Sequence, residues 1–168
     1  NLCGDQSLAD TLSGKLWSDL FSGSEKEFIE AKLQEREARH EKQGGQRYMV
    51  EPNVKEGKGG LRDLQSLFWI TKYVYQSAST IDLVSLNVIT PEEHQIFIKA
   101  EAFLWAVRSH LHLISGRAVE TLSFDMQIEL ADLMGYHDRA GRPAVEIFMQ
   151  DYFRQATSVG DLTLSLIH

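Results

Sequence analysis

Apolar residues recur every three or four positions along most of the chain, the spacing of one face of an α-helix. The clearest case follows Thr90-Pro91-Glu92-Glu93, a strong start signal: a capping threonine, a proline in the first turn and a glutamate three residues after the cap. The helix predicted from there has its apolar face at Phe97, Ala100, Leu104, Val107, Leu111 and Ile114. A last long helix is predicted after Arg142-Pro143, with an apolar side at Val145, Phe148, Tyr152, Ala156, Val159 and Leu166.

Shorter helical patterns fill most of the remaining chain. Asp5 can cap a helix to about Phe21, and Ser24 with Glu27 has the capping-box spacing for a helix to about Gln43, which Gly44-Gly45 ends. Further helices are predicted over about 60–76, over 81–86, and from Ser123 or Phe124 to Gly135. No convincing strand pair appears. The sequence therefore predicts an all-α helical bundle of about five to seven helices, with a glycine-rich loop at 51–60.

The helix predicted over 24–43 differs from the others because it is dense in charge. Its apolar anchors are few beyond Phe28, Ile29 and Leu33. A helix that is polar on most of its surface is typical of a solvated or domain-bridging element. We therefore interpret it in that way, and expect His40, near its end, to be solvated.

Composition is that of an ordinary soluble domain of 168 residues, 43% of them hydrophobic, which is enough for one sizeable core. The formal net charge of −7 argues against nonspecific nucleic-acid binding, which needs a concentrated basic face. No apolar run approaches the ~20 residues that span a bilayer, so no membrane partner is expected. A single cysteine, Cys3, cannot form an internal disulfide, and we expect a reducing, cytoplasmic setting.

The loop Glu51-Pro-Asn-Val-Lys-Glu-Gly-Lys-Gly-Gly-Leu-Arg-Asp63 is the most informative stretch of the chain. Glycines allow a backbone to approach a ligand closely, and a helix that starts after such a loop offers N–H groups to an anion. Positive charge is added at the same place by Lys55, Lys58 and Arg62. The loop is neither of the common glycine-rich phosphate motifs, but we interpret it as phosphate-facing. The competing interpretation is a helix-to-helix connection in which glycine is only punctuation.

Two acids of this loop admit a metal-ligand interpretation, Glu51 and Asp63. Asp63, however, lies in the predicted first turn of a helix, where a carboxylate is favourable without any ligand. We therefore expect a helix-dipole role for it and no metal site in this chain.

Polar residues on the helix after Thr90 form a second candidate group. Glu101, Arg108 and His112 share one stripe, with Trp105 between them. In one interpretation Arg108 contacts a phosphate; in the other, the stripe is a partly buried ion pair with a satisfied histidine, which we favour for His112. The pair His137-Asp138 lacks the further ligands of a metal site, and His110 and His112 do not have a ligand spacing either.

The loop from Glu51 to Asp63 resembles the signature of the PII-protein uridylyltransferase/uridylyl-removing family. Three further segments are similar to family segments in the same order: Leu104-Trp-Ala-Val-Arg-Ser-His-Leu-His-Leu113 with Gly116-Arg117, Phe124-Asp125-x-Gln127, and Val145-Glu-x-Phe-Met-x-x-Tyr-Phe153. The resemblance covers nearly the whole chain. Lys58 stands where proline is common in the family, a small departure.

The resemblance implies the helical domain that follows the nucleotidyltransferase domain, with residues 1–168 as one domain in which 1–43 pack on the missing catalytic domain and 44–168 form the main bundle. The intact enzyme would transfer UMP from UTP to a tyrosine of the PII nitrogen-regulatory protein. Its Mg²⁺ would be held by an Asp-x-Asp, which this chain lacks, and its uridylyl-removing domain would follow residue 168. The chain alone is therefore expected to be inactive.

The composition of the loop, the polar helix stripe and the resemblance together predict roles for single residues of this sequence. The nucleotide- or phosphate-facing set is Lys55, Lys58, Gly59, Gly60, Arg62 and Arg108; the set that shapes the motif is Glu51, Asn53, Gly57 and Asp63. Alternatives stay open on the sequence: a non-catalytic module that recognises PII or bridges domains, a part of a glutamine synthetase adenylyltransferase-like enzyme, or a cyclic-nucleotide-regulated relative that shares only this domain.

Overall fold

The computed structural model describes residues 4–21, 23–46, 48–77 and 79–167. Cys3 lies outside the described residues, as does His168. The described residues form seven α-helices and one π-helical turn: α1 (Gln6–Lys15), η1 (Leu16–Phe21), α2 (Glu25–Lys42), α3 (Leu61–Tyr75), α4 (Thr80–Ser85), α5 (Pro91–Ser115), α6 (Phe124–Leu133) and α7 (Ala144–Ile167). Within these ranges only two isolated β-bridges occur and no strand. The predicted all-α bundle is confirmed.

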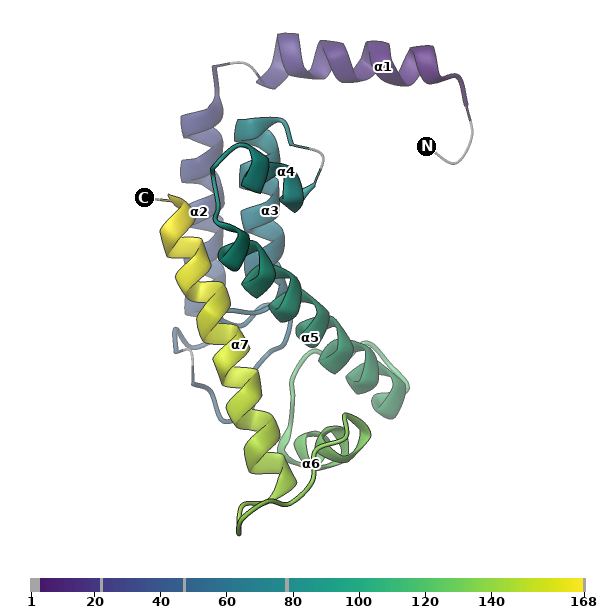
Figure 1. Cartoon of the computed structure of the whole chain (residues 1–168), viewed down its shortest axis with the longest axis vertical. Coiled ribbons are helices and arrows are strands. Elements are labelled where there is room, and N and C mark those ends of the chain that lie inside the picture. The colour runs from purple at the N-terminus through teal and green to yellow at the C-terminus, as the bar shows by residue number, and fades with distance from the viewer. Residues whose placement is uncertain (1–3, 22, 47, 78, 168) are drawn as a thin grey trace.

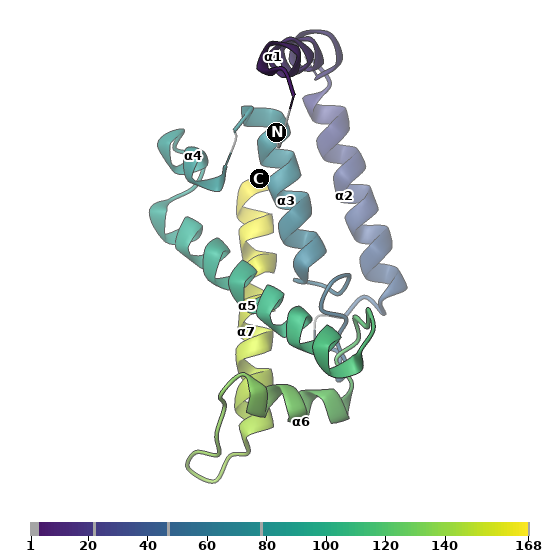
Figure 2. The same ribbon diagram turned by 90° about the vertical axis from the view of Figure 1, so that its right-hand side faces the viewer.

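Helices α3, α5, α6 and α7 enclose the core (Figure 2). The face predicted for α5 is buried from Phe97 to Leu111, and so is that of α7 from Phe148 to Val159. Because Leu104, Val107, Leu111, Phe148 and Val159 are 0% exposed, these two helices meet along their apolar stripes. Figure 1 shows α7 running from the end of the bundle near the start of α2 to the end near α6, and Figure 2 shows α5 crossing it at an angle.

The start and stop signals of several helices are confirmed. Thr90 accepts the N–H of Glu93, whose carboxylate accepts the N–H of Thr90, so that the capping box of α5 is complete. Asp5 caps α1 by accepting the N–H of Ser7. Gly135, with a φ of +78°, follows α6 as predicted.

The predicted capping box of α2 is wrong. Ser24 occupies the N-cap position but makes no capping hydrogen bond. Its hydroxyl lies instead 2.6 Å from the hydroxyl of Tyr73 on α3. Phe28 stacks on the same tyrosine ring at 4.0 Å between centroids, so the start of α2 is fixed by contacts with α3.

The prediction that α2 is a solvated helix is also wrong over its second half. His40 is 2% exposed, and Arg36 and Arg39 turn toward the interior of the bundle. A helix with few apolar anchors is held here by polar contacts to α3, which periodicity alone does not reveal.

Helix α1 projects away from the bundle (Figure 1). None of its residues is buried, and Leu8 and Leu12, which share one face, are 69% and 60% exposed. No helix of the described residues is long and apolar enough to cross a membrane.

Candidate functional site

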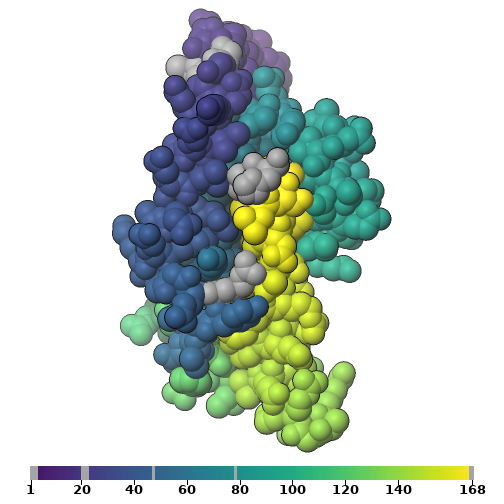
Figure 3. All heavy atoms as spheres, turned by 90° about the vertical axis from the view of Figure 1, so that its left-hand side faces the viewer, coloured from purple at the N-terminus to yellow at the C-terminus, as the bar shows by residue number. Residues whose placement is uncertain are grey.

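The glycine-rich loop is tied to the segment that precedes α6. The N–H of Val54 donates to the carbonyl of Glu120, and the N–H of Leu122 donates to the carbonyl of Pro52, at 2.8 and 2.9 Å. Val54 is completely buried. The loop is therefore held by backbone hydrogen bonds and by an apolar anchor. Just before the loop, Tyr48 packs against Phe153 of α7, and Figure 3 shows this part of the chain next to α7.

Two motif residues shape the loop through their side chains. The Oδ1 of Asn53 accepts the N–H groups of Lys55 and Glu56, at 3.1 and 2.7 Å. The Oε1 of Glu51 accepts the N–H of Phe124 at the start of α6. Both side chains therefore bind backbone within the chain, which is what a shaping role requires.

The glycines of the loop allow close packing of backbone on backbone. A Cβ on Gly59 would lie 2.1 Å from the carbonyl oxygen of Ala156 in α7, and Gly59 has a φ of +80°. A Cβ on Gly57 would lie 2.5 Å from the carbonyl oxygen of Asn53, and one on Gly60 would lie 2.7 Å from that of Val54. Glycine at these positions is therefore needed by the fold itself.

The N–H groups that lead into α3 are occupied within the protein. Gly59 donates to the carboxylate of Asp63, and the next four N–H groups donate to carbonyls of the loop: Gly60 to Gly57, Leu61 to Val54, Arg62 to Lys55 and Asp63 to Gly60. The sequence predicted that such groups face an anion. In this structure the loop itself supplies their acceptors.

Asp63 is the centre of a buried polar cluster. It is 0% exposed and accepts hydrogen bonds from Nε2 of His40, from a guanidinium nitrogen of Arg39 and from the N–H of Gly59. The Nε of Arg36 lies 3.5 Å from its Oδ1. Asp63 does lie in the first turn of α3, as predicted, but its carboxylate connects the loop, α2 and α3.

The cluster determines the ionisation of this carboxyl group. Burial alone would raise the pKa of Asp63. Hydrogen bonding and electrostatic attraction from His40, the charge of Arg36 and the N–H of Gly59 outweigh burial, so that the pKa lies below its ordinary value of 3.8. Asp63 is thus a carboxylate at neutral pH.

Stability should therefore depend on pH through Asp63. Because the pKa is lower in the folded state, the stabilisation is complete above pH 3.8 and is lost as the pH falls through the folded-state pKa. Urea unfolding at pH values on both sides of 3.8 should show a smaller acid loss of free energy for Asp63→Asn than for the unchanged chain. Equal losses would show that other groups cause the acid sensitivity.

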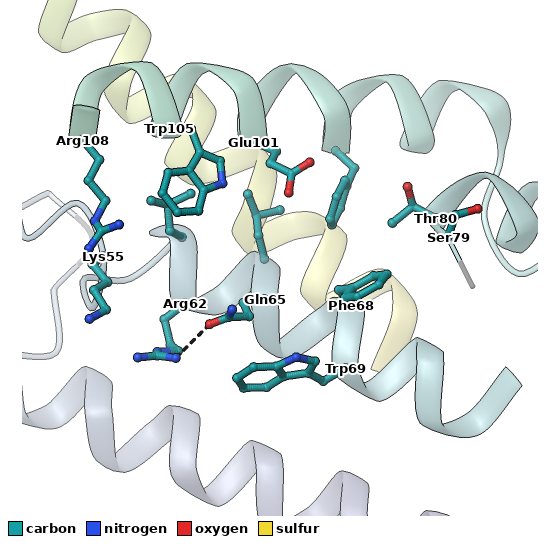
Figure 4. Close-up of a pocket in the computed structure, with 13 residues that line it drawn as sticks. Lys55, Arg62, Gln65, Phe68, Trp69, Ser79, Thr80, Glu101, Trp105 and Arg108 are labelled. Carbon is teal, nitrogen blue, oxygen red and sulfur yellow. Dashed lines mark hydrogen bonds between the residues drawn. The ribbon is translucent and has the colours of Figure 1, made fainter. Parts of the chain in front are cut away.

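A cleft of about 660 Å³ opens between α3 and α5, beside the loop (Figure 4). At one end lie three of the predicted cations, Lys55, Arg62 and Arg108. The rest of the lining includes four aromatic rings, those of Phe68, Trp69, Phe97 and Trp105. Lys58 is not part of this cleft; it lines a separate small pocket that includes Tyr152. The structure thus brings together three of the four predicted cationic side chains.

The cations of the cleft differ in how strongly acids bind them. Arg108 makes a two-pronged ion pair with Glu120, from Nε at 2.8 Å and from Nη2 at 2.6 Å. Arg62 donates to Gln65 at 2.8 Å and more weakly to Glu56 at 3.3 Å. Lys55 lies 3.8 Å from Glu56. Lys55 and Arg62 therefore keep more capacity for an added anion than Arg108 does.

The helix stripe that contains Arg108 is mainly an ion-pair arrangement. The pKa of Glu120 is lowered, first by its hydrogen bonds from Arg108 and despite partial burial. Nε2 of His112 lies 3.6 Å from Glu120 and makes no hydrogen bond among the described residues. The ion pair predicted within this stripe is wrong in its acid, because Arg108 pairs with Glu120 and not with Glu101. The predicted satisfaction of His112 is wrong as well.

The described residues bring together no three His, Cys, Asp or Glu side chains that could hold a metal ion. Asp138, next to His137, accepts the N–H of Ala144 at 2.8 Å and so caps α7. This contact gives the His-Asp pair a place in the fold without a metal.

Several residues that contact the loop or the cleft were not predicted from the sequence. Arg36, Arg39 and His40 lie at relative positions i, i+3 and i+4, one face of a helix, and this signal could have paired them with an acid. Glu120 gave no such signal, because it lies 12 positions after Arg108 in a segment without regular structure.

Comparison with known proteins gives a consistent result. A family model described as GlnD PII-uridylyltransferase matches residues 27–167. A protein of Ruegeria pomeroyi named bifunctional uridylyltransferase/uridylyl-removing enzyme is 62% identical over 162 residues, which are 96% of this chain and 18% of that protein. Proteins with the same name from Cereibacter sphaeroides and Novosphingobium aromaticivorans are 58% and 51% identical over 96% and 95% of the chain, and over 17% and 18% of their own length.

The chain belongs to the PII-uridylyltransferase family. It spans less than a fifth of the length of these relatives. The family resemblance predicted from the loop motif is confirmed. The relatives named above are uridylyltransferases and not glutamine synthetase adenylyltransferases. No solved structure matches the chain.

Proposed function

We propose that this chain is the helical segment of a PII uridylyltransferase, which in its intact form transfers UMP from UTP to a tyrosine of the PII protein. The observation that carries this proposal is the family match over residues 27–167, together with a relative named bifunctional uridylyltransferase/uridylyl-removing enzyme that is 62% identical to the chain over 162 residues. The cleft beside the signature loop is the part of the chain suited to contact the nucleotide.

Within this proposal, Lys55 and Arg62 face the phosphates of UTP. Both line the cleft. Each lies within 4.0 Å of the same acid, Glu56, whose side chain is 26% exposed. A triphosphate carries more negative charge than a single glutamate and would compete for these cations. Arg108 would contribute less directly, because Glu120 already occupies its guanidinium group.

The reaction would be attack of the tyrosine hydroxyl oxygen on the α-phosphorus, which forms the new P–O bond as the bond to pyrophosphate breaks. Mg²⁺ bound by carboxylates elsewhere in the intact enzyme would neutralise phosphate charge. The described residues of this chain contain no group of three His, Cys, Asp or Glu side chains that could hold that ion. The residues of the cleft would bind and orient the nucleotide, which is a large part of catalysis in phosphoryl-type transfer.

Replacing Arg62 with alanine in the intact enzyme should raise the KM for UTP or lower kcat by about tenfold or more, because a charge-assisted hydrogen bond to phosphate is lost. Steady-state kinetics with PII and UTP would measure it. Lys58→Ala is the matched control: it removes a cation of the same loop that lies outside the cleft. Unchanged kinetics of Arg62→Ala, or equal effects of both changes, would contradict the placement of UTP.

We also propose that the N-terminal part of the chain, residues 1–43, packs on the nucleotidyltransferase domain of the intact enzyme through α1. The exposed leucines Leu8 and Leu12 support this, because they form an apolar face that nothing in the described chain covers. Helix α2, in contrast, already packs on α3. This arrangement also accommodates the domain-bridging alternative.

A further inference from the structure

The cleft has two chemically different halves. The cationic end holds Lys55, Arg62 and Arg108, whereas the other half, which we name the aromatic half, is lined by Gln65, Phe68, Trp69, Phe97, Glu101 and Trp105. Figure 4 shows Glu101 and Trp105 reaching from α5 toward α3, and Gln65 and Trp69 on the α3 side. A carboxylate in this half repels phosphate, so an anionic ligand can extend only its neutral part past the cationic end.

Two polar side chains of the aromatic half have hydrogen-bonding capacity that is not used. Among the described residues none donates to the carboxylate of Glu101. The Oε1 of Gln65 accepts from Arg62 at 2.8 Å, which orients the amide and leaves its NH₂ group without an acceptor in the described chain. The half thus offers one acceptor that no described residue occupies, and one amide donor that the hydrogen bond from Arg62 orients.

Trp105 supplies a flat apolar surface next to these groups. Trp105 lines the cleft and is 48% exposed. The guanidinium of Arg108 lies over the indole ring, 5.3 Å from the centroid, and is itself fixed by Glu120. The indole is therefore supported by a neighbour that the ion pair holds, and it retains exposed area on which a planar ring can stack.

The geometry favours a small planar ligand over a peptide. The long walls of the cleft are helices, whose backbone groups bond within each helix. An extended peptide would find no strand edge to pair with. A helical peptide would have to place its apolar side chains against Glu101. A heteroaromatic ring, in contrast, needs one stacking surface and a few polar groups at its edge.

We propose that the aromatic half binds the uracil base of the nucleotide: Trp105 stacks on the ring, Glu101 accepts its N3–H, and the NH₂ group of Gln65 donates to a neighbouring carbonyl oxygen. This assignment rests on the proposed function, because the phosphates that follow the base would occupy the cationic end. It assigns residues of the helical segment to contacts with the base, in addition to those that face phosphate.

The test compares UTP with N3-methyl-UTP, which lacks the N3–H. Equilibrium Kd values of both nucleotides are measured for the intact enzyme and for Glu101→Ala. The change should weaken UTP binding about tenfold, the loss of one hydrogen bond to a charged group, and leave N3-methyl-UTP binding nearly unchanged or improved. Glu92→Ala, which removes an exposed acid of the same helix outside the cleft, should leave both Kd values unchanged.

If Glu101→Ala raises the Kd values of UTP and N3-methyl-UTP by the same factor, the base assignment is overturned. It is also overturned if neither Kd value changes. A higher KM for PII in Glu101→Ala, with an unchanged Kd for UTP, would also overturn it. That result would indicate that the aromatic half contacts the protein substrate. These outcomes differ from a failure of the proposed function. In that case the unchanged enzyme does not bind UTP and Arg62→Ala has unchanged kinetics, which would overturn both proposals.

Discussion

Asp63→Ala is expected to lower the free energy of unfolding by about 3–5 kcal/mol, the cost of breaking a buried ion pair by removing one partner. The change leaves His40, which is 2% exposed, and two arginine side chains that are 10% and 13% exposed without their shared acid. The N–H of Gly59 loses its acceptor as well. Urea unfolding at neutral pH, followed by circular dichroism, measures the loss.

Two further variants make this result specific. Asp125→Ala removes an exposed acid from the first turn of α6 and should cost only about 0.3–1 kcal/mol, the usual helix-dipole contribution. Asp63→Asn keeps the size of the side chain but not its charge, and should fall between the two; it also gives a measurable protein if the alanine variant does not fold. If Asp63→Ala costs no more than Asp125→Ala, the cluster contributes little and a dipole role is sufficient.

The helices could be predicted because their signals are local. Capping residues such as Thr90 and apolar steps such as Leu104 to Val107 act within one or two turns of the chain, and the structure follows them closely. The packing of α2 against α3 could not be predicted in the same way. Its contacts join Arg39 and His40 to Asp63, 24 and 23 positions away, and no periodicity encodes such a distance.

The candidate site was predictable in composition but not in geometry. The sequence indicated that Lys55, Arg62 and Arg108 serve one surface, and the cleft contains all three. It gave no indication that Lys58 would turn to another pocket, or that the loop N–H groups would find acceptors inside the loop. Adjacent residues of an irregular loop point in directions that depend on every preceding φ and ψ, so their spacing in sequence does not determine a shared face.

The same loop yields a second large expected effect, through its glycines. Gly59→Ala should lower the free energy of unfolding by about 1–2 kcal/mol for the positive φ, plus about 1–3 kcal/mol for overpacking. The reason for the second part is that the new Cβ would lie 2.1 Å from the carbonyl oxygen of Ala156, and helix backbone cannot rotate away as a side chain can. Urea unfolding of the two proteins under the same conditions measures the difference.

Gly135→Ala is a closely matched control. Gly135 has a φ of +78°, against +80° for Gly59, but nothing lies within 4 Å of the Cβ that alanine would add. It should show the conformational cost alone, so the excess loss in Gly59→Ala measures how tightly the loop is packed on α7. Equal losses in the two variants would mean that the loop lifts from α7 at little cost. The positions of Lys55 and Arg62 at the cleft would then not depend on that contact.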